Sequence, residues 1–425
     1  MTNFPINTST KPTLQRAQML VFSIALFGVW ILQTAPLQAL PQFSLMTGNR
    51  CLTCHITTQG GGIRGELGWY ASKDVGMLKP KDIPLLKELY ALDGESNSFF
   101  DNTLTFGMDL RAQYAQTARS TTIPGRFFPM QLSLHAAFTP TQWLTVEGTL
   151  NAATFWRRYA GQPAWAASVI IQPDYTLPQL RVGHFQPSIG MRYDDHTMLI
   201  RQVAGSSFPN GQPLIAPYYA DWGAEINYDG LKWLSLTAGA FLPNNLAQSL
   251  TVDERGSGIP PISIISKLPE NPTLQQQFAS PTLLGRALVW LRTEDHALNG
   301  HLGASVLNNG TFTLINAFAG AGLTDALSLM GEYALSGIKD GRQTRNYSVE
   351  LTYRPFSWLY PFVRYEYGTT RQAIPGGIGD YYTRQIVGGV QWFVLPYIEL
   401  RPEVRYVETE AYSGTRFAAQ IHIFY

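Results

Sequence analysis

Apolar and polar side chains alternate along most of the chain from residue 101 to the C-terminus. In residues 104–114, for example, apolar side chains such as Phe106 alternate with polar ones such as Asp109. Alternation with a period of two places successive side chains on opposite faces of a β-strand. The pattern predicts sixteen strands, near residues 104–114, 128–136, 143–156, 165–171, 179–187, 220–228, 233–242, 282–291, 300–307, 311–321, 326–337, 345–354, 359–368, 382–393, 398–407 and 415–425.

The lengths of the strands and of their connections favour a membrane barrel. Many of the strands have about 9–11 residues or more, which is the span that a tilted transmembrane strand needs. The connections on one side are tight, as at residues 229–230, 324–325 and 355–358, whereas three on the other side, residues 188–219, 243–281 and 369–381, are long. Short periplasmic turns and long outer loops are typical of bacterial outer-membrane barrels. We therefore predict an all-β fold, a transmembrane antiparallel β-barrel of sixteen strands.

The last strands carry the clearest evidence for a polar interior. One face of the strand at 398–407 carries four charged side chains, Glu399, Arg401, Glu403 and Arg405. A dry protein core does not accept such a face unless the charges pair, whereas the polar lumen of a barrel does. We expect Arg401, Glu403 and Arg405, with Arg364 and Glu366, to form structural ion pairs, and a relay is the alternative. Pro402 lies in the same strand and predicts irregular pairing there.

The beginning of the chain has the pattern of an export signal. Residues 19–32 are uncharged and mostly apolar, they follow Lys11 and Arg16, and they precede the small residue Ala39. The run is shorter than the roughly 20 residues of a membrane-spanning helix. It predicts a secretory signal peptide, residues 1–39, cleaved after Ala39. An uncleaved N-terminal anchor is the alternative.

The composition is typical of a membrane β-barrel and argues against a nucleic-acid-binding protein. The chain has 31 basic and 30 acidic residues and a net charge of +1, so it lacks the basic excess of a nucleic-acid-binding protein. Only 14% of its residues are charged, and 12% are aromatic. Few charges and many aromatic residues suit a membrane β-barrel better than a soluble domain.

Both cysteines of the chain lie in the sequence Cys51-Leu52-Thr53-Cys54-His55. This spacing is the attachment motif of c-type haem, in which the thiols bond to the porphyrin vinyl groups and the adjacent histidine binds the iron. A redox dithiol and half of a zinc site are the alternatives, but a zinc site needs four ligands and there is no second cysteine pair. We predict one haem c on Cys51 and Cys54, with His55 as an axial ligand.

The ligand on the other side of the iron has several candidates. Methionine and histidine are the usual residues at this position. Met77 lies in a predicted loop after a short helical stretch and is our first candidate, with a packing role as its alternative reading. The remaining candidates are Met46, His135, His184 and His196.

The chain thus divides into three predicted parts. They are the signal peptide (1–39), a small and mostly helical monohaem cytochrome c domain (40–100) and the barrel (101–425). A domain of roughly 60 residues buries little apolar surface by itself and is marginally stable. We therefore expect the haem domain to lie in the barrel lumen or at its periplasmic mouth.

This arrangement resembles the fused outer-membrane monohaem cytochrome–porins, whose best known members belong to iron-oxidising bacteria. The resemblance rests on Pro41, Phe43, Thr47-Gly48 and the motif at residues 51–55. The chain departs from the family at residues 56–62, where iron oxidisers usually carry a Pro-rich stretch containing Phe-Gly-Arg. The resemblance implies electron transfer between an extracellular donor or acceptor, with Fe(II) among the candidate donors, and a periplasmic c-type cytochrome or copper protein. The departure affects the identity of the donor more than the architecture.

A docking position for Fe(II) is suggested by Asp194, Asp195 and His196 on the long connection at 188–219. Carboxylate and imidazole ligands suit this ion. A turn in a polar loop is the alternative reading. Asp295 and His296 form a similar pair, but they fall at the presumed periplasmic rim.

Three functions compete at this stage. The first is an electron conduit of the outer membrane, with Fe(II) oxidation as its potential enzymatic activity. The second is a diffusion porin whose haem domain senses redox state or docks a partner. The third is a soluble periplasmic cytochrome enzyme such as a peroxidase, for which the sequence supplies no second haem motif.

Overall fold

The computed structural model describes most of the chain after the predicted signal peptide, which itself lies outside the described residues. The described residues are 41–57, 60–73, 75–80, 83–84, 96–117, 125–152, 165–191, 198–205, 213–216, 219–246, 250, 280–293, 299–339, 341–374 and 377–425.

Short helices come first in the described part of the chain. They are α2 (Pro41–Thr47), α3 (Cys51–Cys54) and α4 (Glu66–Lys73), and a 3-10 turn, η3 (Leu199–Arg201), follows much later. None of the helices in the described ranges is both long and apolar enough to cross a membrane.

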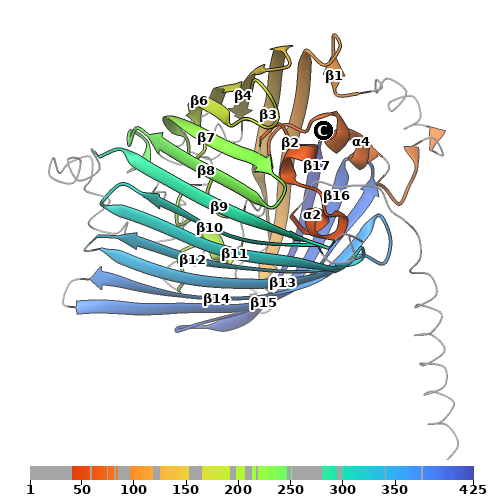
Figure 1. Cartoon of the computed structure of the whole chain (residues 1–425). Coiled ribbons are helices and arrows are strands. Elements are labelled where there is room, and N and C mark those ends of the chain that lie inside the picture. Colours follow the sequence, from red (N-terminus) through yellow and green to blue (C-terminus); the bar gives the residue numbers. More distant parts are fainter. Residues whose placement is uncertain are drawn as a thin grey trace, which may run out of the picture. The chain divides into compact units, whose positions relative to one another are not determined.

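Sixteen long antiparallel strands form a closed ring, and a two-residue strand, β1 (Ser98–Phe99), pairs at its edge with β2. Each strand pairs with the next in sequence, and β17 pairs with β2 to close the ring (Figure 1). The sixteen strands are β2 (Leu104–Thr117), β3 (Arg126–Thr141), β4 (Leu144–Asn151), β5 (Trp165–Ile171), β6 (Gln179–Phe185), β7 (Asp221–Leu231), β8 (Leu234–Phe241), β9 (Thr282–Arg292), β10 (Asn299–Asn308), β11 (Phe312–Thr324), β12 (Leu327–Ile338), β13 (Arg342–Tyr353), β14 (Leu359–Ile374), β15 (Gly377–Leu395), β16 (Ile398–Thr409) and β17 (Ser413–Phe424). The predicted antiparallel barrel of sixteen strands is confirmed.

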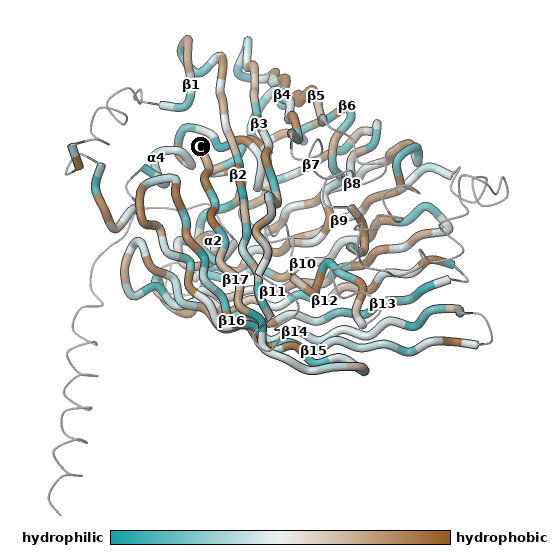
Figure 2. The backbone as a smooth tube through the Cα atoms, turned by 180° about the vertical axis from the view of Figure 1, so that it is seen from behind, coloured by the Kyte–Doolittle hydropathy of each residue, from teal (hydrophilic) through white to brown (hydrophobic). Residues whose placement is uncertain are grey.

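The alternation of side chains has the predicted consequence for the two faces of the wall. On β13, Asn346 and Glu350 are buried towards the interior, whereas Val349 and Leu351 are exposed. Hydrophilic and hydrophobic positions alternate in the same way along the other strands (Figure 2). A ring of strands leaves no unpaired edge, and an apolar outer surface is what a lipid environment requires.

The segment that carries the helices packs against the inner wall on opposite sides of the ring. Helix α2 contacts β10, β11 and β12, while Trp69 of α4 packs against Tyr397, between β15 and β16. Arg50 reaches a third position, where its guanidinium donates to the carbonyls of Asp229 (2.9 Å) and Leu231 (2.7 Å) near the β7–β8 turn. Because the segment contacts strands on several sides of the ring, it lies inside the barrel, at the end that carries the tight turns.

Candidate functional site

The cysteine motif forms one turn of helix. Cys51 and Cys54 begin and end α3, and His55 follows it in an extended conformation while its backbone N–H donates to the carbonyl of Cys51 (2.9 Å). Residues three apart share a face of a helix, so both thiols lie on one side of the turn. Neither cysteine forms a disulfide bond. Cys54 and His55 are buried, and Cys51 is half-buried.

The backbone after the motif folds back over it at Gly60. This residue has a φ of +75°, and a Cβ there would lie 3.4 Å from the Cβ of Cys51 and 3.5 Å from Cδ2 of His55. Glycine is the residue that adopts this conformation without strain. Gly60 therefore lets the chain pass closely over the first cysteine and the histidine.

Helix α4 packs against the C-terminal end of the cysteine motif, at Cys54. A bridge between His55 and Arg64 brings the chain back, and the N–H of Gly65 donates to the carbonyl of Cys54 (3.0 Å). A Cβ at Gly68 would stand 2.2 Å from the same carbonyl oxygen, so only glycine fits there. The motif is thus held between a glycine loop and a helix.

Both cysteines are neutral thiols at neutral pH. Burial raises the pKa of Cys54 to about 11, and the nearby Cys51 adds to the rise while Arg64 opposes it. Burial also raises the pKa of Cys51, with the Arg286 guanidinium opposing and the Asp229 carboxylate adding to the effect. Cys51 therefore lies near enough to Arg286 and Asp229 of the barrel wall for their charges to affect its thiol.

An aromatic cluster fixes the N-terminal segment to the last strands. Phe43 packs edge-on against Tyr360 with ring centroids 4.7 Å apart, and Trp69 stacks on Tyr397 at 5.8 Å. Met46, Val75, Phe393 and Phe424 complete this cluster. Trp69 is fully buried, so the cluster acts as the core that the small segment lacks by itself.

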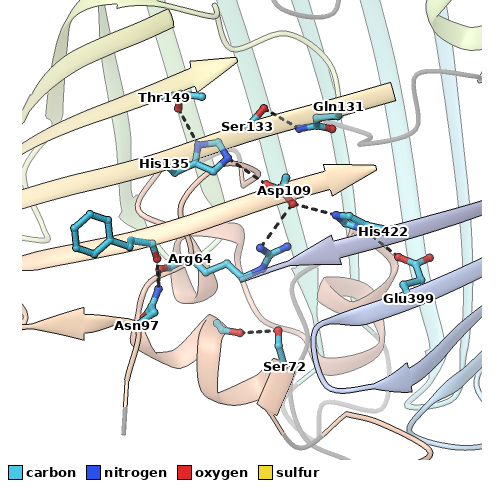
Figure 3. Close-up of polar contacts among 12 residues, drawn as sticks. Arg64, Ser72, Asn97, Asp109, Gln131, Ser133, His135, Thr149, Glu399 and His422 are labelled. Atoms are coloured by element: carbon cyan, nitrogen blue, oxygen red, sulfur yellow. Dashed lines mark hydrogen bonds and ion pairs between the residues drawn. The ribbon is translucent and has the colours of Figure 1, made fainter. Parts of the chain in front are cut away.

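A buried polar network joins the same segment to the first and last strands (Figure 3). Asp109 of β2 lies between two imidazoles, 3.2 Å from Nε2 of His135 and 3.0 Å from Nε2 of His422. The guanidinium of Arg64 lies 4.0 Å from the same carboxylate and 4.4 Å above the ring of Phe424. The network supplies an anionic anchor for Arg64.

The outer members of this network complete the hydrogen bonds of the two histidines. Nδ1 of His422 lies 3.2 Å from Glu399, and Nδ1 of His135 lies 2.9 Å from Thr149. The residues of this network come from five strands, β2, β3 and β4 at the start of the ring and β16 and β17 at its end, and no local motif marks them. The cross-strand pairing of β17 with β2, which opposes Phe424 to Asp109, is the feature that brings them together.

The charged row of the last strands forms the ion pairs that its pattern predicts. Arg364 pairs with Glu350 at 2.9 Å, and Glu403 pairs with Arg401 at 2.7 Å. Nε of Arg405 donates to the same Glu403 (2.8 Å). Charges that pair in this way are stable in a polar lumen, as expected.

The candidates for the second axial ligand lie in different places. The side chain of Met77 is partly exposed, and its N–H donates to the carbonyl of Phe393 at the end of β15 (2.9 Å). Met46 is buried in the aromatic cluster. His135 belongs to the Asp109 network, and His184 lies beside the rings of Trp165 and Trp222.

The proposed Fe(II) ligands Asp194, Asp195 and His196 lie outside the described residues, as do His296 and its neighbour Asp295. Within the described ranges, no group of three or more His, Cys, Asp or Glu side chains is arranged to hold a metal ion.

The long connection between β6 and β7 folds into the barrel where the structure describes it. The N–H of Gly190 donates to Oγ of Ser305 (2.8 Å), and the N–H of Leu199 donates to Glu366 (2.8 Å). The amide of Asn346 donates to the carbonyls of Leu199 and Gln202, each at 2.7 Å. The connection leaves the barrel wall at the end opposite the tight turns, and these parts of it fold inward because polar side chains of the inner wall bind its backbone. A cavity of about 80 Å³ lies between the connection and the wall.

Comparison with known proteins identifies similar folds. No protein-family model and no curated protein sequence matches the chain. Among solved structures, the trimer form of OmpT, an outer-membrane protein of Vibrio cholerae, is 10% identical, covers 76% of this chain and 99% of its own, and has a TM-score of 0.47. The outer-membrane protein OpdK of Pseudomonas aeruginosa is 12% identical, covers 77% of this chain and all of its own, and has a TM-score of 0.38. The assignment of the fold as a barrel rests on the strand pairing of this chain itself.

Proposed function

We propose that this protein is an electron-transfer protein of the bacterial outer membrane. It carries one haem c and passes electrons between an extracellular donor, for which Fe(II) is a candidate, and a periplasmic carrier such as a c-type cytochrome or a copper protein. The observation that carries this proposal is the placement of Cys51, Cys54 and His55. They form one helical turn held inside the end of a barrel.

The residues around the motif fit the group that the motif implies. Cys51 and Cys54 lie on one face of the helical turn, from which two thioether bonds to one porphyrin would extend, and His55 follows them as an imidazole ligand. Gly60 provides a close backbone approach over Cys51 and His55. Bound haem supplies an iron centre that accepts and releases one electron.

The position of the motif suggests how donor and acceptor approach. In outer-membrane barrels the tight turns face the periplasm, and the segment with Cys51 lies at that end. The hydrocarbon layer is about 30 Å thick, so one site does not cross it alone. A periplasmic protein can approach the motif directly, whereas an extracellular donor has to enter the lumen.

The inserted connection is the proposed route for that donor. Met191 and Met198 are buried inside the barrel, and Asp194, Asp195 and His196 lie between them in sequence. We propose these three as a docking position for Fe(II), whose hard oxygen and imidazole ligands they provide.

A diffusion porin is the second candidate function, with a haem domain that senses redox state or docks a partner. It is favoured by the inserted connection, whose backbone is hydrogen-bonded to Ser305, Glu366 and Asn346 across the lumen. A loop that narrows a polar lumen is suited to a pore that selects small solutes.

The two candidates are separated by reduction in sealed vesicles. The full chain is exported in a host with haem-attachment machinery, and its absorbance is recorded after Fe(II) is added outside under anoxic conditions. Electron transfer predicts reduction of the haem by external Fe(II), while the double variant C51A/C54A shows no haem absorbance. Because an open pore also admits Fe(II), a c-type cytochrome is enclosed in the vesicles as an acceptor, and its reduction at the same rate with wild type and with C51A/C54A would support the porin function instead. A colourless purified protein overturns both haem-based readings.

A further inference from the structure

His301 on β10 is a buried imidazole whose two ring nitrogens have no hydrogen-bond partner among the described residues. Its side chain is 6% exposed, and its neighbour Leu302 is exposed on the outer surface, so the alternation of the strand turns His301 inward. Buried polar groups are nearly always satisfied, and an exception calls for an explanation such as a ligand or an ion.

The side chains that contact His301 are largely apolar, with the charged Arg286 nearby, although the inner wall elsewhere is polar. The rings of Trp290 and Phe318 lie with centroids 5.9 Å and 6.2 Å from the imidazole. A Cβ at Gly320 would stand 3.1 Å from Nε2 of His301 and 2.7 Å from Cδ1 of Leu45. Leu288, Met191 and Met330 belong to the same apolar cluster as Leu45, Phe318 and Trp290. Apolar side chains and aromatic rings are suited to the faces of a porphyrin.

The cysteine motif faces the same part of the wall. Arg50, which directly precedes Cys51, lies with its guanidinium 5.7 Å from the ring of Trp290, and Trp290 lies against His301. The charge of Arg286 on β9 lowers the pKa of the Cys51 thiol, so the two residues lie near each other. The guanidinium of Arg286 also lies 5.3 Å from the ring of Phe318. Its positive charge is suited to a carboxylate of the kind that haem propionates provide.

We propose that His301 is the second axial ligand of the haem iron, and that Trp290, Phe318 and Leu45 pack against the porphyrin. The proposal rests on the proposed function, since it requires haem at Cys51 and Cys54. Coordination of the iron would satisfy one of the two orphaned ring nitrogens of His301, and the other candidates are less suited. Met77 is partly exposed, Met46 is packed in the aromatic cluster, and both nitrogens of His135 are engaged.

The test is the spin state of the iron in the full-length, exported protein. Wild type is expected to give the low-spin absorbance and electron paramagnetic resonance spectra of two imidazole ligands. H301A is expected to become high-spin and to bind carbon monoxide when reduced, and free imidazole is expected to restore the low-spin spectrum. The matched control is H184A, which removes another buried histidine of the wall and should leave the spectrum unchanged.

A second variant guards against a folding defect in H301A. H301M offers a thioether in place of the imidazole and is expected to give a low-spin iron with the spectrum of histidine–methionine ligation. Folding of each variant is checked by heat-modifiable gel mobility, and covalent haem is checked by mass and pyridine haemochrome spectrum.

The outcomes distinguish this proposal from the proposed function. If H301A and H301M both keep the wild-type low-spin spectrum, His301 is not the ligand, although the haem site stands. Conversion to high spin by M77L or M46L overturns the proposal in the same way. Wild type without covalent haem overturns the proposed function and this proposal together.

Discussion

Gly60 is the residue on which the backbone around the two cysteines most depends. Its positive φ turns the chain back over Cys51 and His55, and a Cβ there would lie in van der Waals contact with both side chains. Gly62 has a similar φ of +66°, but a Cβ there would meet nothing within 4 Å. Substitutions at Gly60 and Gly62 therefore share the strain of a positive φ but differ in whether the new Cβ contacts Cys51 and His55.

We expect G60A to lower the haem content of the exported protein several-fold relative to G62A. A non-glycine residue in the left-handed region costs about 1–2 kcal/mol in either position, so the difference between the variants reports contact with Cys51 and His55. Haem content is measured as haemochrome absorbance per mole of protein. Equal haem content in the two variants would contradict the assigned role of Gly60.

At this scale the sequence alone predicts the cysteine motif as a haem site but not the residues that surround it. Cys51, Cys54 and His55 are recognisable because the chemistry of attachment fixes their spacing within five residues. Asp109 and His422 are more than 300 positions apart, and only the closure of the ring brings them together. His301 is marked by its missing hydrogen bonds, which no sequence pattern records.

At the scale of elements, the alternation of side chains predicts the strands well and their ends less well. The predicted loop at 369–381 is largely strand, because β14 and β15 continue their pairing to Ile374 and Gly377. Polar residues occupy both faces of this extension, so it lacks the alternation that marks the strands below it. Pro402 lies where pairing between β15 and β16 is interrupted, as predicted from its missing N–H.

The inserted connection between β6 and β7 offers a second test at this scale. Asn346 binds the carbonyls of Leu199 and Gln202, and loss of these two hydrogen bonds weakens the attachment by about 1–3 kcal/mol. We expect N346A to raise the mean ion conductance of the protein in planar lipid bilayers and to broaden its fluctuations. N308A, which removes an amide bound to Thr313 near the β10–β11 turn, is the control. Identical conductance in N346A and wild type would show that this attachment does not hold the connection.

At the scale of the whole molecule, the N-terminal segment and the barrel form one packed unit. Arg64 reaches Asp109, and Trp69 packs on Tyr397, so strands from both ends of the ring hold the segment. The sequence predicts a position in or at the barrel because the segment is too small to be stable by itself. It does not predict which strands receive it.

We expect D109N to loosen the N-terminal segment while the barrel stays folded. The change removes the negative charge opposite Arg64 and replaces one of the two carboxylate oxygens that contact His135 and His422 with an amide NH2, whereas the ladders of the wall are unaffected. Proteolysis of the segment in opened outer-membrane vesicles should become several-fold faster. D325N is the control, since the side chain of Asp325 is 65% exposed and lies 3.9 Å from Arg354. Equal cleavage rates in the two variants would contradict the role of Asp109 as an anchor.

The burial of Cys54 and His55 also constrains the order of events during biogenesis. Both residues lie beneath α4 and Gly60 within a segment that rests on Phe424 and Tyr397, near the end of the polypeptide. A maturation enzyme that modifies the thiols needs access to an extended chain, which the finished assembly does not offer. Any covalent modification of these cysteines therefore has to be complete before the last strand joins the first.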